Sequence, residues 1–274
     1  MNKKVVLITG ASSGIGKATA LKLIDEGYMV YAAARNIKNM QDILQKGGKI
    51  FSLDVTKEDQ VKAFVDYVLD KETRIDVLFN NAGFGLYGAV EDVSMQDAKY
   101  QFDVNLFGLA SMTKAVLPIM RNQKAGLIIN TSGMAGRVYT PFGSWYHASK
   151  YALEGFSDCL RLEVESFGIK VVLLEPGMIA TNFFNVLNDN VEKYIDQSPY
   201  ESSYKSMLKS FSVDELKTNG TDVSVIANLV SKIIKKKNPK YRYLKGYMSK
   251  TAVFGKAVLK DRIYSKIVKK RMGV

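Results

Sequence analysis

The sequence predicts an α/β fold: a single domain built on a doubly wound parallel sheet of about seven strands, with helices on both faces. Short runs rich in β-branched residues alternate with helical patterns through the first two-thirds of the 274 residues. The runs are continuously apolar, as in strands buried on both faces, and the alternation is typical of a parallel sheet with helical crossovers. Apolar residues make up 47% of the chain, enough to fill the core of such a domain.

The expected strands are short apolar runs, and each ends at a polar residue, a glycine or a proline. We expect them at Val5–Thr9, Met29–Ala34, Lys49–Asp54, Asp76–Asn80, Leu127–Thr131, Lys170–Glu175 before Pro176, and Tyr241–Leu244. The helical segments between them show apolar residues at a spacing of three to four. They cover residues 14–26, a helix that Thr56 caps and that begins near Lys57, Ser94–Arg121, Trp145–Phe167 and Asp222–Lys236.

The domain divides into four parts along the chain. Because residues 1–176 contain a glycine-rich segment of the kind that binds dinucleotides, Thr9–Gly16, we expect them to form a dinucleotide-binding core. We expect 177–220 to form a substrate-binding loop or lid, 221–246 a closing helix and strand, and 247–274 a basic C-terminal helix or tail. The lid carries no strand pattern and mixes polar residues with apolar ones. The apolar residues expected to form the lid of a pocket are Met178, Ile179, Phe183, Phe184, Val186 and Leu187.

The net charge of +12 is concentrated at the C-terminal end. From Ser231 to Val274 there are 15 lysines and arginines against the single acid Asp261, so the other 230 residues sum to about −2. Apolar and basic residues interleave at helical spacing between Ala252 and Arg271, which permits a basic amphipathic helix. Such a helix packs on its own domain, rests on an anionic membrane surface, or covers an apolar substrate mouth. No aromatic-interleaved groove accompanies it, so nucleic acid is not an expected partner.

The short apolar runs, the single cysteine and the single histidine indicate the compartment and the absence of a metal site. The first residues carry only a short apolar run, and no stretch of 18 apolar residues occurs, so we expect a cytoplasmic protein with no secretory signal or membrane span. The single cysteine, Cys159, allows no internal disulfide and is expected to be a small buried side chain. His147 is the only histidine, and no metal site is expected.

A glycine-rich loop stands directly between the first strand and the first helix, in the segment Thr9–Gly16. There Gly10 allows a tight turn, Gly14 lets the backbone approach a pyrophosphate, and Gly16 allows close packing of helix on sheet. The helix N-terminus presents N–H groups and partial positive charge to the phosphates. The alternative is an ordinary turn, but the position between strand and helix favours a Rossmann-type dinucleotide site that also includes Ser12, Ser13 and Ile15.

The residue after the second strand indicates which dinucleotide is bound. An NAD site usually places an acid there to bind the ribose 2′-hydroxyl, whereas this sequence has Ala34 followed by Arg35. A guanidinium can hold a 2′-phosphate through charge-assisted hydrogen bonds, with Ser12 and Ser13 as further donors. The alternative is a solvated loop arginine. We therefore expect NADP(H), with NAD(H) less favoured.

A tyrosine and a lysine stand four residues apart, at Tyr146 and Lys150, near the start of a helical segment. This spacing puts both side chains on one helix face. A tyrosine is a poor acid–base group at its ordinary pKa near 10, and a neighbouring ammonium lowers that pKa. The pair alone is weak evidence, but together with the phosphate loop it indicates proton transfer by Tyr146. His147 points away from this face, and Trp145 either lines the substrate entrance or packs in the core.

Together, these motifs resemble those of the short-chain dehydrogenases/reductases, from about Lys4 to Thr181. The matching segments, in the order of the family, are Thr9–Gly16, Asp54 with Val55, Asn80–Gly83, Asn105, Tyr146 with Lys150, and Pro176–Thr181. The resemblance implies that Asp54 and Val55 meet the adenine, and that Asn81, Ala82 and Gly83 line the adenine-ribose side. It also implies that Pro176, Gly177, Ile179 and Thr181 clamp the nicotinamide carboxamide.

The resemblance further implies hydride transfer between nicotinamide and a carbonyl or carbinol carbon. Tyr146 would be the acid–base group, Lys150 would hold the ribose, and Asn105 would position a water for a proton relay. One position departs from the pattern, because the family's serine, 13 residues before the tyrosine, is Gly133 here. Ser132 is the candidate replacement, and Thr131 and Ser144 are alternatives. The family also suggests a dimer or tetramer built on the two long helices.

We therefore predict an NADP(H)-dependent oxidoreductase that acts on the carbonyl/alcohol pair of a lipophilic small molecule. Gly133 motivates an alternative of another class, an NADP-binding sensor or scaffold with weak or lost catalysis. Binding of NADPH without turnover would distinguish the second from the first.

Overall fold

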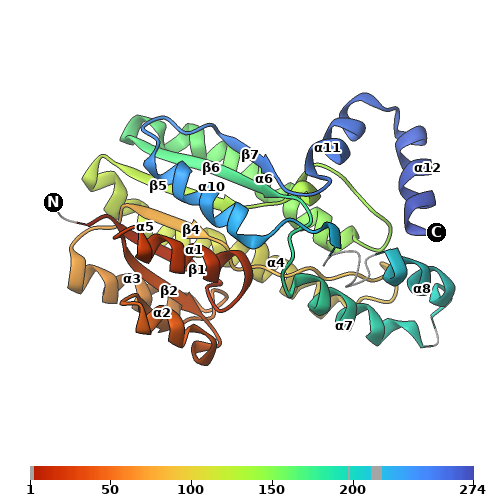
Figure 1. Cartoon of the computed structure of the whole chain (residues 1–274), viewed down its shortest axis with the longest axis horizontal. Coiled ribbons are helices and arrows are strands. Elements are labelled where there is room, and N and C mark those ends of the chain that lie inside the picture. The colour runs from red at the N-terminus through yellow and green to blue at the C-terminus, as the bar shows by residue number, and fades with distance from the viewer. Residues whose placement is uncertain (1–2, 197, 211–217) are drawn as a thin grey trace.

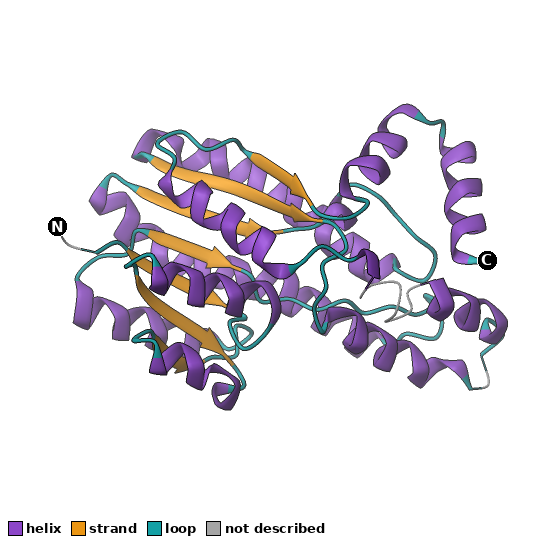
Figure 2. Cartoon of the chain, viewed as in Figure 1, coloured by secondary structure: helices purple, strands orange, loops and turns teal. Residues whose placement is uncertain are grey.

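Seven strands form one parallel sheet in the order β3-β2-β1-β4-β5-β6-β7 (Figure 1). The structure is a computed structural model. It describes residues 3–196, 198–210 and 218–274, apart from the side chains of Phe184 and Ser210. The strands are β1 (Val5–Thr9), β2 (Met29–Ala34), β3 (Lys49–Ser52), β4 (Val77–Asn80), β5 (Gly126–Thr131), β6 (Ile169–Pro176) and β7 (Arg242–Lys245). Figure 2 shows them as a twisted layer between helices. The predicted fold class is confirmed.

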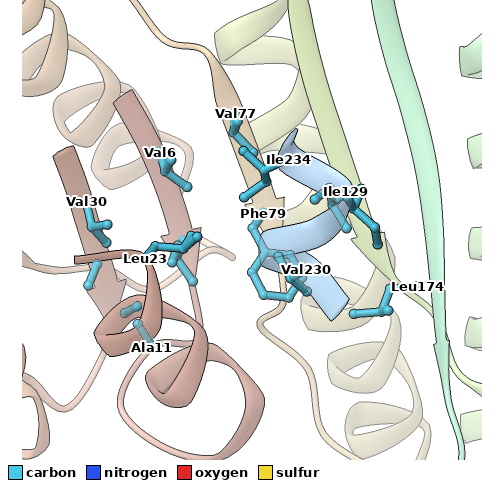
Figure 3. Close-up of a cluster of buried hydrophobic side chains, with 14 of the residues drawn as sticks. Val6, Ala11, Leu23, Val30, Val77, Phe79, Ile129, Leu174, Val230 and Ile234 are labelled. Carbon is cyan, nitrogen blue, oxygen red and sulfur yellow. The ribbon is translucent and has the colours of Figure 1, made fainter. Parts of the chain in front are cut away.

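The helices cover both faces of the sheet and bury its apolar side chains. On one face, α1 (Gly14–Asp25), α2 (Gln41–Gln45, after the 3₁₀ turn Ile37–Met40) and α10 (Val223–Lys235) enclose a cluster that includes Val6, Val30 and Phe79 (Figure 3). On the other, α3 (Glu58–Glu72), α5 (Leu109–Gln123) and α6 (Ser144–Val164) cover a second cluster. Alternate residues of each buried strand supply the two clusters.

Several element boundaries differ from those predicted. Lys57 rather than Thr56 is the N-cap of α3, because the Thr56 hydroxyl donates to Asp54 Oδ1 at 2.8 Å. The single helix expected over Ser94–Arg121 is α4 (Met95–Phe102), a π-helical turn (Asp103–Gly108) and α5. The helix expected over Trp145–Phe167 is α6 followed by a 3₁₀ turn at Glu165–Phe167. Another 3₁₀ turn, Met134–Gly136, follows β5.

Apart from α10 and β7, the described helices after β6 form a helical layer beyond the carboxyl ends of the strands (Figure 1). The expected lid contains α7 (Phe183–Ile195) and α8 (Glu201–Ser210). The basic tail forms two helices rather than one, α11 (Ser249–Val258) and α12 (Asp261–Met272), because Leu259 and Lys260 have extended backbones. Residues of α7, α8 and α12 share a buried cluster that includes Leu187, Tyr204 and Met272.

The structure contradicts one expectation about composition. Cys159 is exposed on α6, so the expected burial is wrong; the helix turns this position away from the sheet. Over the described ranges, no helix is long and apolar enough to cross a membrane.

Candidate active site

A cavity of about 770 Å³ lies at the carboxyl ends of the strands, where parallel α/β sheets bind ligands. All sequence-predicted site residues line it except Gly16 and Asn105. The lining residues among them are Gly10, Ser12, Ser13, Gly14, Ile15, Arg35, Asp54, Val55, Asn81, Ala82, Gly83, Ser132, Tyr146, Lys150, Pro176, Gly177, Ile179 and Thr181. Residues that are distant in sequence therefore meet in a single space.

The glycine loop requires glycine on steric grounds. Gly10 has φ +66°, and a Cβ there would lie 2.7 Å from the Ala82 Cα. A Cβ on Gly16 would lie 2.4 Å from the Gly10 carbonyl oxygen, which explains why Gly16 matters without lining the cavity. Asn81 Nδ2 donates to the carbonyl oxygens of Thr9 and Gly10 at 3.3 and 3.2 Å. The loop is thus braced against β4 with the N-terminus of α1 at the cavity.

The end of β2 presents a cation to the same cavity. Arg35 is exposed, and its guanidinium Nη1 donates to the Tyr100 hydroxyl at 2.7 Å. On the next strand, Asp54 Oδ1 accepts hydrogen bonds from the Thr56 amide and hydroxyl at 3.0 and 2.8 Å. The carboxylate of Asp54 is therefore held in place, and Arg35 is the charged group nearest the end of β2 in the cavity lining.

Tyr146 and Lys150 lie one turn apart on α6, and both are buried, with 9% and 5% of their surfaces exposed. Lys150 Nζ donates to the Thr131 carbonyl oxygen at 2.8 Å, so the end of β5 fixes the ammonium. Burial raises the pKa of Tyr146, and the neighbouring Tyr87 raises it further. This direction is opposite to the one expected from Lys150 alone. Burial lowers the pKa of Lys150 to about 8, against the opposing effect of Glu154.

Asn105 lies behind the lysine, in the π-helical turn, and is buried. Its Nδ2 donates to the Phe84 carbonyl oxygen at 3.0 Å and to Ser149 Oγ at 3.1 Å, and its Oδ1 accepts from the Phe84 amide at 3.1 Å. A Cβ on Gly83 would lie 3.0 Å from Asn105 Oδ1 and 3.6 Å from Lys150 Nζ. Asn105 and Lys150 therefore face the same glycine.

Gly133, rather than Ser132, faces the Tyr146 hydroxyl. A Cβ on Gly133 would lie 3.9 Å from the Tyr146 hydroxyl oxygen, and its φ of +149° disfavours other residues. The Ser132 hydroxyl lies against Gly136 and Glu154, and it lowers the pKa of Glu154, although burial raises that pKa more. Neighbouring residues at a strand end point in opposite directions, which accounts for the difference.

The alternatives to Ser132 occupy two different places. Thr131 lines the cavity and uses its carbonyl oxygen to hold Lys150. Ser144 is exposed at the start of α6 and is not among the cavity residues.

A polar cluster of Tyr87, Thr140 and His147 lines the cavity next to the tyrosine, and the sequence did not predict it. His147 Nδ1 lies 2.9 Å from the Ala135 carbonyl oxygen, which only accepts, so Nδ1 carries the proton. His147 Nε2 therefore accepts, with Thr140 Oγ1 at 2.9 Å and the Tyr87 hydroxyl at 3.4 Å. Burial lowers the pKa of His147 and keeps it neutral. Tyr87 and Thr140 lie in irregular segments, where no periodicity marks them.

The opposite wall of the cavity is mainly apolar. Five of the expected lid residues, Met178, Ile179, Phe183, Val186 and Leu187, line the cavity, and the Phe184 side chain lies outside the described residues. The Phe183 and Tyr146 ring centroids are 5.7 Å apart. The C-terminal helices contribute further apolar residues, including Ala252, Leu259, Ile267 and Val268. Trp145 packs beside Leu86 and Val93 and is not part of the lining.

Comparison with known proteins identifies the family. Residues 4–192 match the family described as short chain dehydrogenase. The chain is 39% identical over 245 residues to a 3-ketodihydrosphingosine reductase of Bacteroides thetaiotaomicron, covering 88% of this chain and 87% of that one. This chain therefore belongs to the short-chain dehydrogenase/reductase family and is an NAD(P)-dependent oxidoreductase.

Two solved structures extend the comparison to the cofactor. An alcohol dehydrogenase from the archaeon Thermococcus sibiricus, complexed with 5-hydroxy-NADP, has a TM-score of 0.73 and 25% identity, over 90% of this chain and 98% of that one. A short-chain dehydrogenase/reductase from Burkholderia phymatum in complex with NAD has a TM-score of 0.75 and 25% identity, over 88% and 89% of the two chains. A nicotinamide cofactor is therefore supported for this chain.

Within the described part of the chain, no group of three or more His, Cys, Asp or Glu side chains is placed to hold a metal ion.

Proposed function

We propose that this chain is an NADPH-dependent reductase of lipophilic carbonyl compounds, with Tyr146 as the proton donor. The observation that carries the proposal is the position of the buried Tyr146–Lys150 pair in the cavity. We call residues 3–176, from which the glycine loop, Arg35, Asp54 and Val55 line the cavity, the nucleotide half. The pair lies between the glycine loop of this half and the apolar wall made by α7, α11 and α12. A reductase needs this juxtaposition, because the substrate oxygen must reach both the acid and the hydride donor.

The residues of the nucleotide half fit NADP(H). The glycine loop forms a cradle that a Cβ at Gly10 would fill, and the N-terminus of α1 opens into it. Arg35 supplies a cation for a 2′-phosphate, and Asp54 and Val55 line the adenine end. When bound, the reduced cofactor supplies a hydride for the carbonyl carbon. The preference for NADP(H) over NAD(H) rests on Arg35.

The proton chemistry follows from the environment of the pair. Because burial raises its pKa, Tyr146 is protonated at neutral pH and can donate to an alkoxide that develops on the substrate oxygen. Lys150, held by the Thr131 carbonyl oxygen, would hold the ribose of the cofactor. Both amide hydrogens of Asn105 are engaged and its Oδ1 accepts from the Phe84 amide, which leaves one Oδ1 lone pair to accept from a water beside Lys150. That water would connect Lys150 to solvent, so that a proton can return from solvent through Lys150 to the tyrosine after each turnover.

The apolar wall and the relatives support a lipophilic substrate. Phe183, Leu187 and Leu259 offer no strong hydrogen-bonding groups, so their wall favours hydrocarbon over sugar. The relative named 3-ketodihydrosphingosine reductase is 39% identical. We therefore propose ketones or aldehydes with a long alkyl chain as substrates.

The experiment follows NADPH absorbance at 340 nm with carbonyl compounds of increasing chain length. The expected result is turnover with kcat/KM that rises with alkyl length, since each added methylene buried contributes about 0.8 kcal/mol. If no carbonyl consumes NADPH and no alcohol generates it from NADP, the proposal fails.

The second candidate, an NADP-binding sensor or scaffold, is motivated by Gly133, which offers no hydroxyl at the Tyr146 side. It predicts NADPH binding, seen as a thermal shift, without turnover of any carbonyl in the same panel. Without a hydroxyl at Gly133, the rate of an enzyme can be about 10² to 10³ lower, because one preorganised hydrogen bond is lost. Tyr146→Phe separates a slow enzyme from a sensor: it should lower any slow turnover that Tyr146 catalyses, whereas a sensor has no such turnover to lose.

We also propose a dimer or tetramer built on the long helices. Phe107 and Leu162 are 60% and 67% exposed, so both segments, Ser94–Arg121 and Trp145–Phe167, offer a large apolar side chain that a second chain can cover. A mass from light scattering equal to one chain would contradict this. The cytoplasmic location stays a prediction.

A further inference from the structure

The two C-terminal helices carry large apolar side chains that no other part of the described chain covers. Phe254 and Val258 of α11 are 69% and 59% exposed, and Ile263 and Ile267 of α12 are 48% and 51% exposed. A globular domain usually buries side chains of this size. Four of them close together in the last 26 residues therefore need an explanation.

These side chains form stripes that border the cavity. Phe254 and Val258 are four residues apart and share one face of α11, next to the face that lines the cavity through Thr251 and Gly255. On α12, Ile263 and Ile267 are likewise four apart, and Ile267 itself lines the cavity.

The inward face of α12 is a separate stripe. Tyr264 and Met272 are 6% and 4% exposed, so this face anchors the helix. Figure 1 shows α11 and α12 as a hairpin beyond the strand ends, with the C-terminus beside α8. The exposed stripes, Phe254 and Val258 on α11 and Ile263 and Ile267 on α12, thus form the outer rim of the cavity on the side of its apolar wall. We call this surface the rim.

The same helices are strongly basic. Residues 249–274 contain eight lysines and arginines and one acid, Asp261, which pairs with Lys256 at 2.5 Å. Within the described residues, no salt bridge involves Lys250, Lys260, Arg262, Lys266, Lys269 or Lys270. Exposed apolar side chains interleaved with lysines are typical of helices that lie at a lipid–water interface.

We propose that α11 and α12 dock this rim on an anionic lipid surface, so that the cavity opens toward the bilayer. Phe254, Val258 and Ile263 enter the interface, and the lysines bind the lipid phosphates. A lipophilic substrate then passes from the membrane into the cavity without crossing water. This inference rests on the proposed function for its substrate, but the docking itself does not.

Charge decides between this occupant and a second copy of the chain. Two copies joined at this rim would bring two basic faces together, which opposes association. An anionic lipid surface complements the charge and also receives the apolar stripes.

The test is flotation of the NADPH-loaded full chain with two kinds of vesicle, phosphatidylcholine alone and phosphatidylcholine with phosphatidylglycerol. The expected result is binding to the anionic vesicles only, and weaker binding as the salt concentration rises. Two double variants change rim residues that do not line the cavity, Phe254→Ser with Ile263→Ser and Lys266→Glu with Lys269→Glu. Each should lower the partition coefficient by at least about tenfold.

Matched controls place the same changes elsewhere. Leu44→Ser removes an exposed apolar side chain from α2, and Lys57→Glu with Lys114→Glu reverses two exposed lysines far from the rim in sequence. These variants should bind as the parent does. Docking is overturned if the parent stays unbound, if the controls lose as much binding as the rim variants, or if Phe254→Ser changes the mass in solution, since a second copy would then cover the rim.

Activity in the same samples separates this proposal from the proposed function. With a short water-soluble aldehyde and NADPH, the rim variants should turn over at the parental rate, whereas with a long-chain ketone delivered in anionic vesicles they should be slower. Vesicle binding without turnover of any carbonyl contradicts the reductase and leaves docking standing. Turnover of soluble aldehydes without vesicle binding contradicts docking alone.

Discussion

The nucleotide half, residues 3–176, and the helical layer of α7, α8, α11 and α12 meet at one cavity but are built in different ways. In the nucleotide half, backbone contacts set the shape, since a Cβ on Gly10 or Gly16 would lie within 2.7 Å of another main-chain atom. In the helical layer, side chains such as Phe183 and Leu187 make the wall, and a Cβ on Gly255 would meet nothing within 4 Å. The first region tolerates little change, and the second can vary with its substrate.

Tyr146, the proposed proton donor, belongs to both regions. Its position is set by α6 and its neighbour Lys150, but its surroundings include the rings of Phe183 and Tyr87, 5.7 and 5.8 Å away between centroids. Burial among these rings raises the pKa of Tyr146. The apolar wall therefore sets the protonation state of the proposed acid, whose position the nucleotide half sets.

Tyr146→Phe should have the largest effect. Removing the hydroxyl deletes the proton donor without changing the ring packing, so kcat should fall by about 10² to 10⁴. NADPH affinity, measured by fluorescence titration, should stay within a few-fold, because the loop that binds the phosphates is untouched. Full activity in this variant would contradict the assigned mechanism.

Lys150 should couple stability to pH. Its folded pKa of about 8 lies below the ordinary 10.5, so between these values the unfolded chain binds a proton that the folded chain does not. Stability therefore rises with pH across this window, by up to about 3 kcal/mol relative to Lys150→Met. Urea unfolding of both proteins at pH 7 to 10.5 measures the change.

The control for this pH effect is an exposed lysine on α5. Lys114→Met should differ from the parent by the same amount at every pH, because that side chain is exposed. A pH-independent difference between the parent and Lys150→Met would show that the ammonium is not buried in solution.

Gly16→Ala tests the backbone-defined half. A Cβ there lies 2.4 Å from the Gly10 carbonyl oxygen and 2.6 Å from Asn81 Nδ2, so the loop must move. We expect destabilisation of roughly 1–3 kcal/mol and weaker NADPH binding. Thermal unfolding with and without NADPH checks both. An unchanged midpoint and an unchanged NADPH shift would argue against a rigid cradle.

The same division explains how much the sequence could predict. The glycine loop, Arg35 and the Tyr146–Lys150 spacing were readable because backbone geometry and charge require particular residue types at fixed positions. The seven-strand sheet followed from continuous apolar runs. Ser132 was the expected hydroxyl, but strand alternation turns it toward Glu154 and leaves Gly133 at the tyrosine.

The helical layer was harder to predict for a physical reason. The helices α7 and α8 were expected as an irregular lid, because their apolar residues are interrupted by polar ones that face solvent. Tyr87 and Thr140 reach the cavity from loops, so no helical or strand periodicity in the sequence predicts their positions. Cys159 is exposed since only the tertiary arrangement decides which face of α6 meets the sheet.

Arg35→Ala should change the choice of cofactor. Loss of a charge-assisted contact to the 2′-phosphate should raise KM for NADPH by about 10- to 100-fold and leave KM for NADH nearly unchanged. Lys38→Ala, which removes a nearby exposed cation from the turn after β2, is the matched control. Equal losses with both cofactors would mean that Arg35 acts on the loop rather than on the phosphate.

Gly255→Ala should have the smallest effect and the opposite sign. Gly255 lies inside α11, and a Cβ there would meet nothing within 4 Å, so alanine fits without moving any neighbour. Alanine is favoured over glycine in a helix interior by about 1 kcal/mol, which should raise the thermal midpoint slightly. NADPH affinity should not change, because α11 belongs to the helical layer. Gly16→Ala is the same substitution in a helix of the nucleotide half, and there the thermal midpoint should fall. If Gly255→Ala also lowered the thermal midpoint, the backbone would constrain both regions equally.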